Sequence, residues 1–531
     1  MKYKINKTGA AWLIITVIAL ASCKKNFESI NTPPQGATAN ATPMVYNAIV
    51  SSLPISAGEY SVLNSWIYPI TQQGIVVGGS YNFDNAKLAV WQNYYQTLAN
   101  YRLMQHRIDT SANPSAMNNF YAMLKTLMAY KTFKTTNYYG DMPYSQAGYA
   151  PLLQDSGFKA AFDKQSDIYD SVLTDLKWAV DHFTNDASQF SVGSYETFLN
   201  NNISLWAKFA NSLRLYVAVT LYDKNSALAA THITDALSKP LLADGDDIGL
   251  WPAKISGLQF QWRQWSFSAN CYLRMGTTMW DLMSSNDSTN GHGIFDLRAR
   301  IFFEANDSAQ WAAYPQNPNN APSEGGAPYN PVRFTKWDSL GTGCIYSPFN
   351  LYFEQDLTSI PELMLTSAQV HFIKAEIYNR GLGVTASTAI AMAEYNAGIA
   401  ASLNMWKSIA FNSNVWLVNK PGAATATPGE ISAVQNSTVA AYDMANATHA
   451  LSQIYAQLWI DQYRQPWDAW LLLRRTGGKT PMSTDNTQYY NANYSTYQRF
   501  VYPDEELSYN TDNWNAAGSI KDNKVKLWIT K

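Results

Sequence analysis

The chain has 531 residues, of which 47% are hydrophobic, 14% aromatic and 15% charged, and its formal net charge is -2. This length allows one large domain or two to three ordinary ones. The near-neutral charge argues against a strongly basic surface, so neither nucleic acid nor an anionic membrane surface is predicted as a partner. The 18 Trp and 34 Tyr exceed what a core of this size needs. We therefore expect many of these rings at a binding surface.

The first 22 residues have the pattern of a secretory signal, with lysines followed by an apolar run and then small residues. The apolar run, residues 10–21, is shorter than the ~20 residues of a membrane-spanning helix. It leads into the tetrapeptide LASC that ends at Cys23. This tetrapeptide has the form of a bacterial lipobox and predicts a signal peptide over residues 1–22 with lipidation of Cys23. The alternative is an ordinary cleaved signal followed by a chance cysteine.

Residues 23–45 are rich in Pro, Asn, Thr and Ala and predict a lipid anchor with a flexible tether. We expect residues 46–531 to form a single domain. Two further cysteines, Cys271 and Cys344, can form one disulfide in an exported protein. Two buried free thiols are an equally weighted alternative.

Helical patterns dominate up to about residue 236. Apolar residues recur at helical spacing within residues 91–102, 121–131, 168–180 and 206–221. Ser204 is expected to cap the last of these helices. The character changes over about 237–360, where Gly, Pro, Asn and Trp predict long ordered loops, with one helix at about 267–283.

Helices return after residue 361. Gly381 is placed to end the first of them in a left-handed conformation. The next helix carries alanines four or three residues apart along one side, which suggests a close helix crossing: Ala389, Ala393, Ala397 and Ala400. Two helices joined by a tight turn are typical of a tetratricopeptide-like hairpin. A last long helix, about 450–475, is expected to kink or break at Pro466, and the aromatic tail is expected to pack across the helices.

Seven phrases together resemble the SusD/RagB family of outer-membrane nutrient-binding lipoproteins. They occur in the family's order between the lipobox and the C-terminus: TNYYGDMPYSQA (136–147), FDKQSDIYDSVLTDLKWAV (162–180), WAKFANSLRLYVAV (206–219), FDLRARIFF (295–303), LTSAQVHFIKAEIYNRGL (365–382), QLWIDQYRQPWDAWLLLRRTGG (457–478) and RFVYPDEELSYN (499–510).

The resemblance implies a mainly α fold in which four tetratricopeptide-like helical hairpins form a right-handed scaffold with a loop-rich irregular insertion. It implies a non-catalytic lipoprotein of the outer membrane, at the cell surface, that captures a nutrient for a SusC-like TonB-dependent β-barrel. The ligand is expected to be an oligosaccharide, with a peptide as the alternative. One departure from the family habit concerns the anchor, because Lys24 and Lys25 follow Cys23 where surface-exported relatives often carry acidic residues.

The family's binding loops vary with the ligand, so the candidate residues come from the chemistry of sugar recognition. Flat aromatic faces suit the C–H side of a pyranose, and amides suit its hydroxyls. By analogy with the family, we expect the site in the loop before residue 91 and in the central insertion. The candidates are Tyr81, Asn82, Trp262, Trp265, Trp311 and Trp337.

Metal and enzyme signatures are weak. The acidic group of Asp244, Asp246 and Asp247 fits no complete calcium loop, and an Asx-turn is the favoured interpretation. The six histidines are scattered and no phosphate-binding glycine loop is present. We therefore expect no metal, no cofactor and no catalytic residue, with a lipid-anchored glycosidase as the less favoured alternative.

Overall fold

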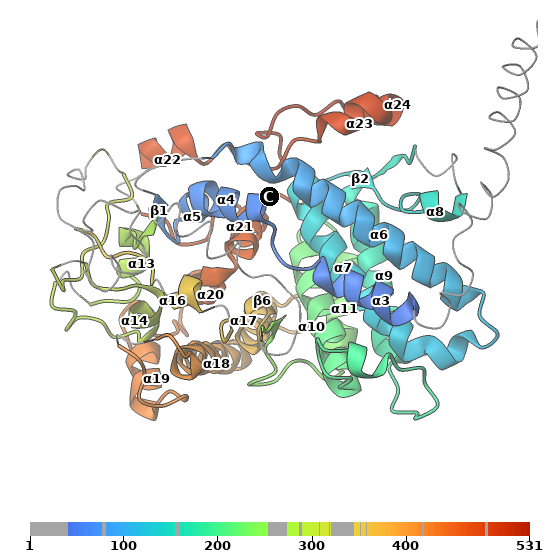
Figure 1. Ribbon diagram of the computed structural model, residues 1–531. Coiled ribbons are helices and arrows are strands. Elements are labelled where there is room, and N and C mark those ends of the chain that lie inside the picture. Colours follow the sequence, from blue (N-terminus) through green and yellow to red (C-terminus); the bar gives the residue numbers. More distant parts are fainter. Residues whose placement is uncertain are drawn as a thin grey trace, which may run out of the picture.

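The computed structural model describes residues 41–76, 81–153, 159–252, 273–285, 289–306, 308–317, 319, 345–350, 352–356, 358–416, 419–483 and 487–531. The fold is mainly helical, as predicted, and the strands in these ranges form two-stranded pairs. Figure 1 shows two groups of long helices, with short elements beside one group and the C-terminal segment along the top. Among the described residues, no helix is both long and apolar enough to cross a membrane.

The first group contains α6 (Lys87–Asp109), α7 (Asn118–Tyr139), α9 (Gln165–His182), α10 (Ile203–Leu221) and α11 (Ser226–Leu237), which pack successively against one another. The predicted stripe on α9 is confirmed, since Ile168, Val172 and Leu176 are buried. The predicted cap of α10 is wrong. The helix begins earlier, at Ile203, and the Asn202 side chain accepts a hydrogen bond from one of the free N–H groups of the first turn, that of Leu205.

Shorter elements surround this group. Before α6 come α3 (Ala41–Ser51), α4 (Ala57–Val62), η1 (Leu63–Ile67), α5 (Tyr68–Thr71), β1 (Ile75–Val76) and η2 (Phe83–Ala86). Between the long helices lie η3 (Pro114–Met117), β2 (Met142–Pro143), α8 (Ala150–Leu153), β3 (Phe162–Asp163) and η5 (Gly193–Tyr195). β2 and β3 form an antiparallel pair that closes the turn between α7 and α9.

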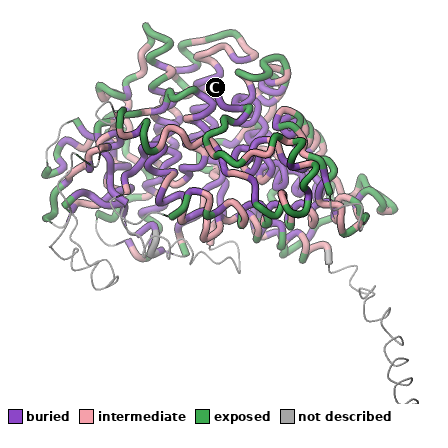
Figure 2. The backbone as a smooth tube through the Cα atoms, turned by 90° about the horizontal axis from the view of Figure 1, so that it is seen from above, coloured by how far each residue is buried: buried purple, intermediate pink, exposed green. Residues whose placement is uncertain are grey.

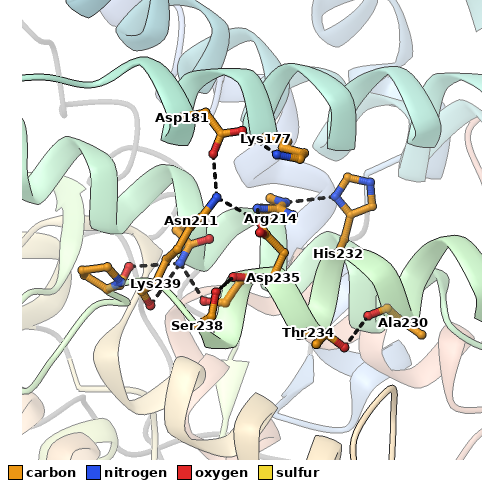
Figure 3. A network of polar contacts seen from close by, with 12 residues as sticks. Lys177, Asp181, Asn211, Arg214, Ala230, His232, Thr234, Asp235, Ser238 and Lys239 are labelled. Carbon is orange, nitrogen blue, oxygen red and sulfur yellow. Dashed lines mark hydrogen bonds and ion pairs between the residues drawn. The ribbon is translucent and has the colours of Figure 1, made fainter.

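A network of polar contacts joins α9, α10 and α11 (Figure 3). Arg214, which is fully buried on α10, donates from Nε to His232 Nδ1 at 2.9 Å and from Nη1 to Asp235 Oδ2 at 2.6 Å. Lys239 then joins Asp235 to Asp181 of α9. Because the guanidinium needs an acceptor at His232, the imidazole is held in its neutral form.

The imidazole of His232 makes stability depend on pH. Burial, followed by the positive charge of Arg214, lowers the pKa of His232 from 6.5 to about 4. Between these values the unfolded chain binds a proton that the folded chain does not, so acidification from pH 6.5 to 4 lowers the free energy of unfolding. After allowance for partial solvation of the ring, we expect this contribution to be about 1–2 kcal/mol.

The measurement is urea unfolding of the wild type and His232→Gln at pH 7 and pH 4.5. The glutamine retains an acceptor but does not titrate, so the variant should lose about 1–2 kcal/mol less than the wild type between these two pH values. Equal losses in the two proteins would show that His232 does not contribute.

The second group is built on α17 (Ser367–Arg380) and α18 (Thr388–Asn412). Gly381 has φ 69° and ends α17 in the left-handed conformation, as predicted. The expected alanine stripe is not the packed face of α18, since Ala389 and Ala393 are exposed. Gly398 makes the close approach instead, because a Cβ there would lie 2.7 Å from the ring of Phe372.

The predicted break at Pro466 is confirmed. The expected single helix is divided into α20 (Ala447–Asp461), η7 (Gln462–Arg464) and α21 (Pro466–Arg475), with the proline in the first turn of α21. α19 (Pro428–Gln435) packs on α18, and the tail forms α22 (Thr487–Asn493), α23 (Asp504–Tyr509) and α24 (Thr511–Ala516). The tail packs across the helices, as expected, and Trp91 Nε1 of α6 donates to Glu506 of α23 at 3.3 Å.

The described part of the central insertion has short elements: β4 (Ile248–Leu250), β5 (Leu273–Arg274), α13 (Thr277–Trp280), α14 (Arg298–Phe302), α16 (Tyr352–Gln355) and β6 (Glu362–Leu365). The helix expected at about 267–283 is wrong over its described part, where β5 and α13 stand in its place. β5 pairs antiparallel with β1, and β4 pairs with β6. Figure 2 shows buried backbone through the interior and exposed backbone at the rim.

Candidate functional site

The candidate site begins at a local irregularity of the N-terminal helices. Residues 63–67 form η1, a π-helical turn between α4 and α5. π-helical turns are rare and often occur at functional sites. Within this turn Leu63, Ser65 and Ile67 are buried, whereas the indole of Trp66 is half-exposed. The turn therefore presents one large aromatic ring at the surface.

The segment before α6 is fixed to this ring. Trp66 Nε1 donates to the main-chain oxygen of Tyr81 at 2.7 Å, and the main-chain N–H of Tyr81 donates to Ser65 Oγ at 3.2 Å. The side chain of Tyr81 is 37% exposed. Asn82 follows, and its side-chain oxygen accepts from Asp84 N at 2.8 Å and caps η2. Two predicted site residues thus lie next to a third residue that was not predicted.

The C-terminal tail supplies more rings. The ring centroid of Tyr497 lies 4.7 Å from that of Trp66, and the centroid of Tyr494 lies 6.2 Å from it. Tyr489 of α22 lies 6.0 Å from Tyr494. All three tyrosines are half-buried, and α22 lies near α4 and α5 in Figure 1. Segments more than 400 residues apart in the sequence therefore form one surface.

We call this surface the aromatic surface and define it by Trp66, Tyr81, Tyr489, Tyr494 and Tyr497. Burial raises the pKa of Tyr497, with a further contribution from Asp84, and burial also raises the pKa of Tyr494. Their hydroxyl groups therefore remain protonated and can donate at neutral pH. Partly exposed rings with neutral hydroxyls and an amide at the edge suit a neutral, hydroxyl-rich ligand.

The other predicted site residues have different positions. Trp311 is only 4% exposed, its ring stacks 6.3 Å from that of Trp280, and the guanidinium of Arg300 lies 5.5 Å from its centroid. We therefore assign Trp311 to packing within the insertion rather than to the binding surface. Trp262, Trp265 and Trp337 lie outside the described residues, as do Cys23, Cys271 and Cys344.

The pairing of β1 with β5 relates two predicted regions. Val76, the last described residue of β1, pairs with Leu273, the first residue of β5. Residues 77–80 lead to Tyr81, and residues 253–272 contain Trp262 and Trp265. In the sequence, the segment before Tyr81 therefore follows β1, and the segment with Trp262 and Trp265 precedes β5.

The side chains of the acidic group before β4 contact α10 and α17. Asp246 pairs with Lys208 at 2.8 Å, and Asp247 accepts from the main-chain N and the Oγ of Ser367 at the start of α17. Asp244 accepts from His371 at 3.1 Å. Burial raises the pKa of Asp247 to about 6. In the part of the chain that the structure describes, no cluster of His, Cys, Asp or Glu side chains has the arrangement of a metal site.

A cavity of about 490 Å³ lies between α13, the start of α20 and residues 479–483. Hydroxyl-bearing and aliphatic side chains line it, together with Asp281, His449 and Lys479. No Phe, Tyr or Trp side chain occurs among its described lining residues. Because it has no such ring to stack on a pyranose, we favour the aromatic surface as the sugar site.

Sequence reasoning missed Trp66, Tyr489, Tyr494 and Tyr497. The density of tyrosines in residues 489–497 was a usable signal, but it was interpreted as packing of the tail. Trp66 carried no local signal, because a single tryptophan in an apolar helical stretch is typical of a core residue.

The chain is similar to known proteins in sequence and in fold. The model of the SusD-like family described as "Starch-binding associating with outer membrane" matches residues 38–503. A solved chitin-binding protein has a TM-score of 0.69 at 21% identity and covers 92% of this chain and 100% of its own.

A SusD homolog from Parabacteroides distasonis has a TM-score of 0.67 at 18% identity, over 92% of this chain and 98% of its own. A chitin-binding SusD homolog from Flavobacterium johnsoniae has a TM-score of 0.63 at 18% identity, with the same coverage. A comparison with curated protein sequences gives no match. With most of its length matched by the family model, the chain belongs to the SusD-like family.

Proposed function

We propose that this protein captures an oligosaccharide at the outer membrane and delivers it to a SusC-like TonB-dependent transporter. The aromatic surface is the observation that carries the proposal. Its partly exposed rings lie together, Asn82 follows Tyr81 in the chain, and burial raises the pKa of Tyr494 and Tyr497, so that these two hydroxyl groups stay neutral. Sugar recognition uses this combination of flat apolar faces and oriented polar groups.

The comparisons support the ligand class. The family description refers to starch binding and the outer membrane, and two of the similar structures are described as chitin-binding. The ligand of this chain is therefore proposed to be a glycan. Trp262, Trp265 and Trp337 remain proposed contacts on the chemistry of their side chains alone.

The proposed location follows from the N-terminal sequence and the family. Lipidation of Cys23 would anchor the protein to the outer membrane, and residues 24–40 would connect the lipid to α3, which begins at Ala41. The proposed role at the cell surface is binding without catalysis. The ligand would then be released unchanged to the transporter.

The test is calorimetric titration of residues 24–531 with starch, chitin and other oligosaccharides and with short peptides. Saturable binding of an oligosaccharide, recovered intact, supports the proposal. Binding of peptides alone would contradict the glycan assignment, and the appearance of shortened products would contradict a non-catalytic role.

A clean test of the aromatic surface is Tyr81→Ala. The ring of Tyr81 is exposed, whereas its main-chain contacts to Trp66 and Ser65 do not need the side chain. We expect an affinity loss of about 5- to 10-fold, the effect of about 1 kcal/mol from one lost ring contact. Stability should change little.

Tyr509→Ala is the matched control, because Tyr509 is 75% exposed and lies on α23 outside the aromatic surface. Its affinity should equal that of the wild type. If the two variants bind equally well, the aromatic surface is not the site.

A further inference from the structure

A cavity of about 260 Å³ lies between the start of α7 and the segment that joins α9 to α10. Its lining residues come from the ranges 119–123, 184–192 and 201–203, so it shares no residue with the aromatic surface. The volume is just below the roughly 300–1,000 Å³ of sites for drug-sized ligands, which suits one or two sugar units. We call it the Phe190 cavity.

The Phe190 cavity and the aromatic surface lie in different parts of the molecule. Phe120, which lines the cavity, packs against Tyr46 of α3 with the ring centroids 6.1 Å apart. In Figure 1, α3 lies at the right, whereas α22 of the aromatic surface lies at the upper left. A ligand in the cavity would therefore occupy a separate site.

Two phenylalanine rings form one wall of the cavity. The ring centroids of Phe120 and Phe190 lie 5.4 Å apart at an interplanar angle of 73°. Phe120 is buried, but Phe190 is 37% exposed, the same fraction as Tyr81 of the aromatic surface. Phe190 therefore has accessible ring surface for the C–H face of a sugar.

Hydrogen bonds hold this wall in place. The main-chain N–H of Phe190 donates to the main-chain oxygen of Ala116 at 2.7 Å. Gln189 Nε2 donates to the main-chain oxygen of Ser115 at 2.9 Å, and Gln189 Oε1 accepts from the main-chain N of Asn119 at 3.1 Å. Because the wall is already ordered, little conformational entropy is lost when a ligand binds.

Two further amides fix the shape of the cavity. Asn119 Nδ2 donates to the main-chain oxygen of Thr184 at 2.8 Å, and Asn119 Oδ1 accepts from the main-chain N of Thr184 at 2.9 Å. Asn201 Nδ2 donates to the main-chain oxygen of Gly193 at 2.8 Å, and Asn201 Oδ1 accepts from Ser191 Oγ at 3.1 Å. These contacts close the segment 184–201 around the cavity.

The accessible polar groups are an amide and a carboxylate. Asn185 lines the cavity and is exposed, and its side chain makes no hydrogen bond to another described residue. The amide can donate to one sugar hydroxyl and accept from another. Asp186 is also exposed, and a hydrogen bond from the main-chain N of Ser188 lowers its pKa, so it is ionised at neutral pH. With no Lys, Arg or His among the described lining residues, the cavity suits a neutral ligand rather than an anionic one.

Another exposed ring adjoins the cavity. Tyr195 of η5 is 48% exposed, and its main-chain N–H donates to the main-chain oxygen of Val192, a lining residue, at 3.2 Å. Phe190 and Tyr195 are among the most exposed aromatic residues of the described structure, and they are only five positions apart. Rings so close along one segment can contact neighbouring units of one oligosaccharide.

We propose that the Phe190 cavity is a second binding site for a neutral oligosaccharide. Phe190 contacts the face of one sugar unit, Asn185 binds its hydroxyls, and Tyr195 contacts the adjoining unit. The inference rests on the proposed function for the ligand class, but not on the aromatic surface for the site. Two sites on one protein can hold a long glycan more tightly than either site alone, because the second contact is intramolecular.

The test is calorimetric titration of residues 24–531 with neutral trisaccharides of the starch and chitin types. We expect two equivalents of the bound trisaccharide. Phe190→Ala should weaken one of the two sites by about 5- to 10-fold, through the loss of one ring contact, and leave the other site unchanged. Asn185→Ala should weaken the same site by about 3- to 10-fold, and it leaves the fold intact because its side chain is exposed and without a partner in the described structure.

Phe411→Ala is the matched control. Phe411 is 36% exposed, nearly the same fraction as Phe190, and it lies on α18 outside both the cavity lining and the aromatic surface. The variant should bind two equivalents with wild-type affinities.

A single equivalent whose affinity is unchanged in Phe190→Ala and Asn185→Ala would overturn the inference and leave the proposed function intact. Equal effects of Phe190→Ala and Phe411→Ala would also overturn it. Failure of the aromatic surface gives a different result, because Tyr81→Ala would then have no effect while Phe190→Ala still weakened binding. Absence of binding by any oligosaccharide would overturn both proposals.

Discussion

Replacement of Trp66 with alanine is expected to weaken oligosaccharide binding by about 30- to 100-fold, corresponding to about 2–3 kcal/mol. The indole has three roles at the aromatic surface. Its half-exposed face is available to the ligand, its Nε1 holds the main chain of Tyr81 at 2.7 Å, and its ring supports Tyr497 at 4.7 Å. The substitution therefore removes one contact and releases two others.

Trp66→Phe separates these roles. It retains an aromatic ring beside Tyr497 but loses the N–H that binds Tyr81, so its affinity should lie between those of the wild type and the alanine variant. Calorimetric titration measures the affinities, and circular dichroism shows whether each variant is folded. A folded Trp66→Ala protein with wild-type affinity would exclude the aromatic surface as the binding site.

Replacement of Glu376 with alanine is expected to lower the free energy of unfolding by about 3–5 kcal/mol. Glu376 is fully buried on α17. Its two carboxylate oxygens accept hydrogen bonds from Nη1 and Nη2 of Arg475 on α21, at 3.0 and 2.8 Å. Arg380 and the hydroxyl of Tyr455 from α20 each donate to it at 2.8 Å. One carboxylate thus joins α17, α20 and α21.

The electrostatics explain the size of this effect. Burial by itself would raise the pKa of Glu376, but the adjacent guanidinium of Arg475 outweighs it, so the pKa is lowered and the group stays ionised. Alanine would leave Arg475 buried without an anion, and removal of one partner from a buried pair costs more than the pair contributes.

The matched control is Lys164→Ala. Its ion pair with Asp141, at 3.1 Å, involves a lysine side chain that is 68% exposed, so the loss should stay below about 1 kcal/mol. Urea unfolding of both variants at pH 7 gives the comparison. Equal losses would show that the buried carboxylate does not stabilise the packing of α17, α20 and α21.

These helices also support the binding features. Trp470 of α21 lies beneath the aromatic surface, and Arg475 of the same helix binds Glu376. Phe83, at the start of η2, packs 6.0 Å from Trp470 and 4.5 Å from Tyr497. The aromatic surface therefore lies directly on the packed core that the helices provide.

The sequence by itself determined the helical class, the positions of the long helices and several of their ends. The stripe on α9, the left-handed Gly381 after α17 and the break at Pro466 are local properties, set by side-chain periodicity and by backbone restrictions at Gly and Pro. The seven family phrases lie in or beside such elements. Such features can be predicted from sequence because the residues that interact lie only a few positions apart.

Where two neighbouring residues could both fill one structural role, the sequence predicted the wrong one. Ser204 and Asn202 are both good capping residues, and only the observed start of α10 chooses Asn202. The alanines of α18 suggested a crossing, but Gly398 makes it, because the approach of Phe372 decides which face of the helix is packed.

Tertiary structure alone decided which aromatic residues share a surface. Tyr81 and Asn82 could be proposed from their chemistry, whereas Trp66 and Tyr497 join them only because the tail returns across the N-terminal helices. Trp311 has the same chemistry but is buried against Trp280. Exposure and long-range proximity depend on packing of the whole chain, and no local pattern encodes them.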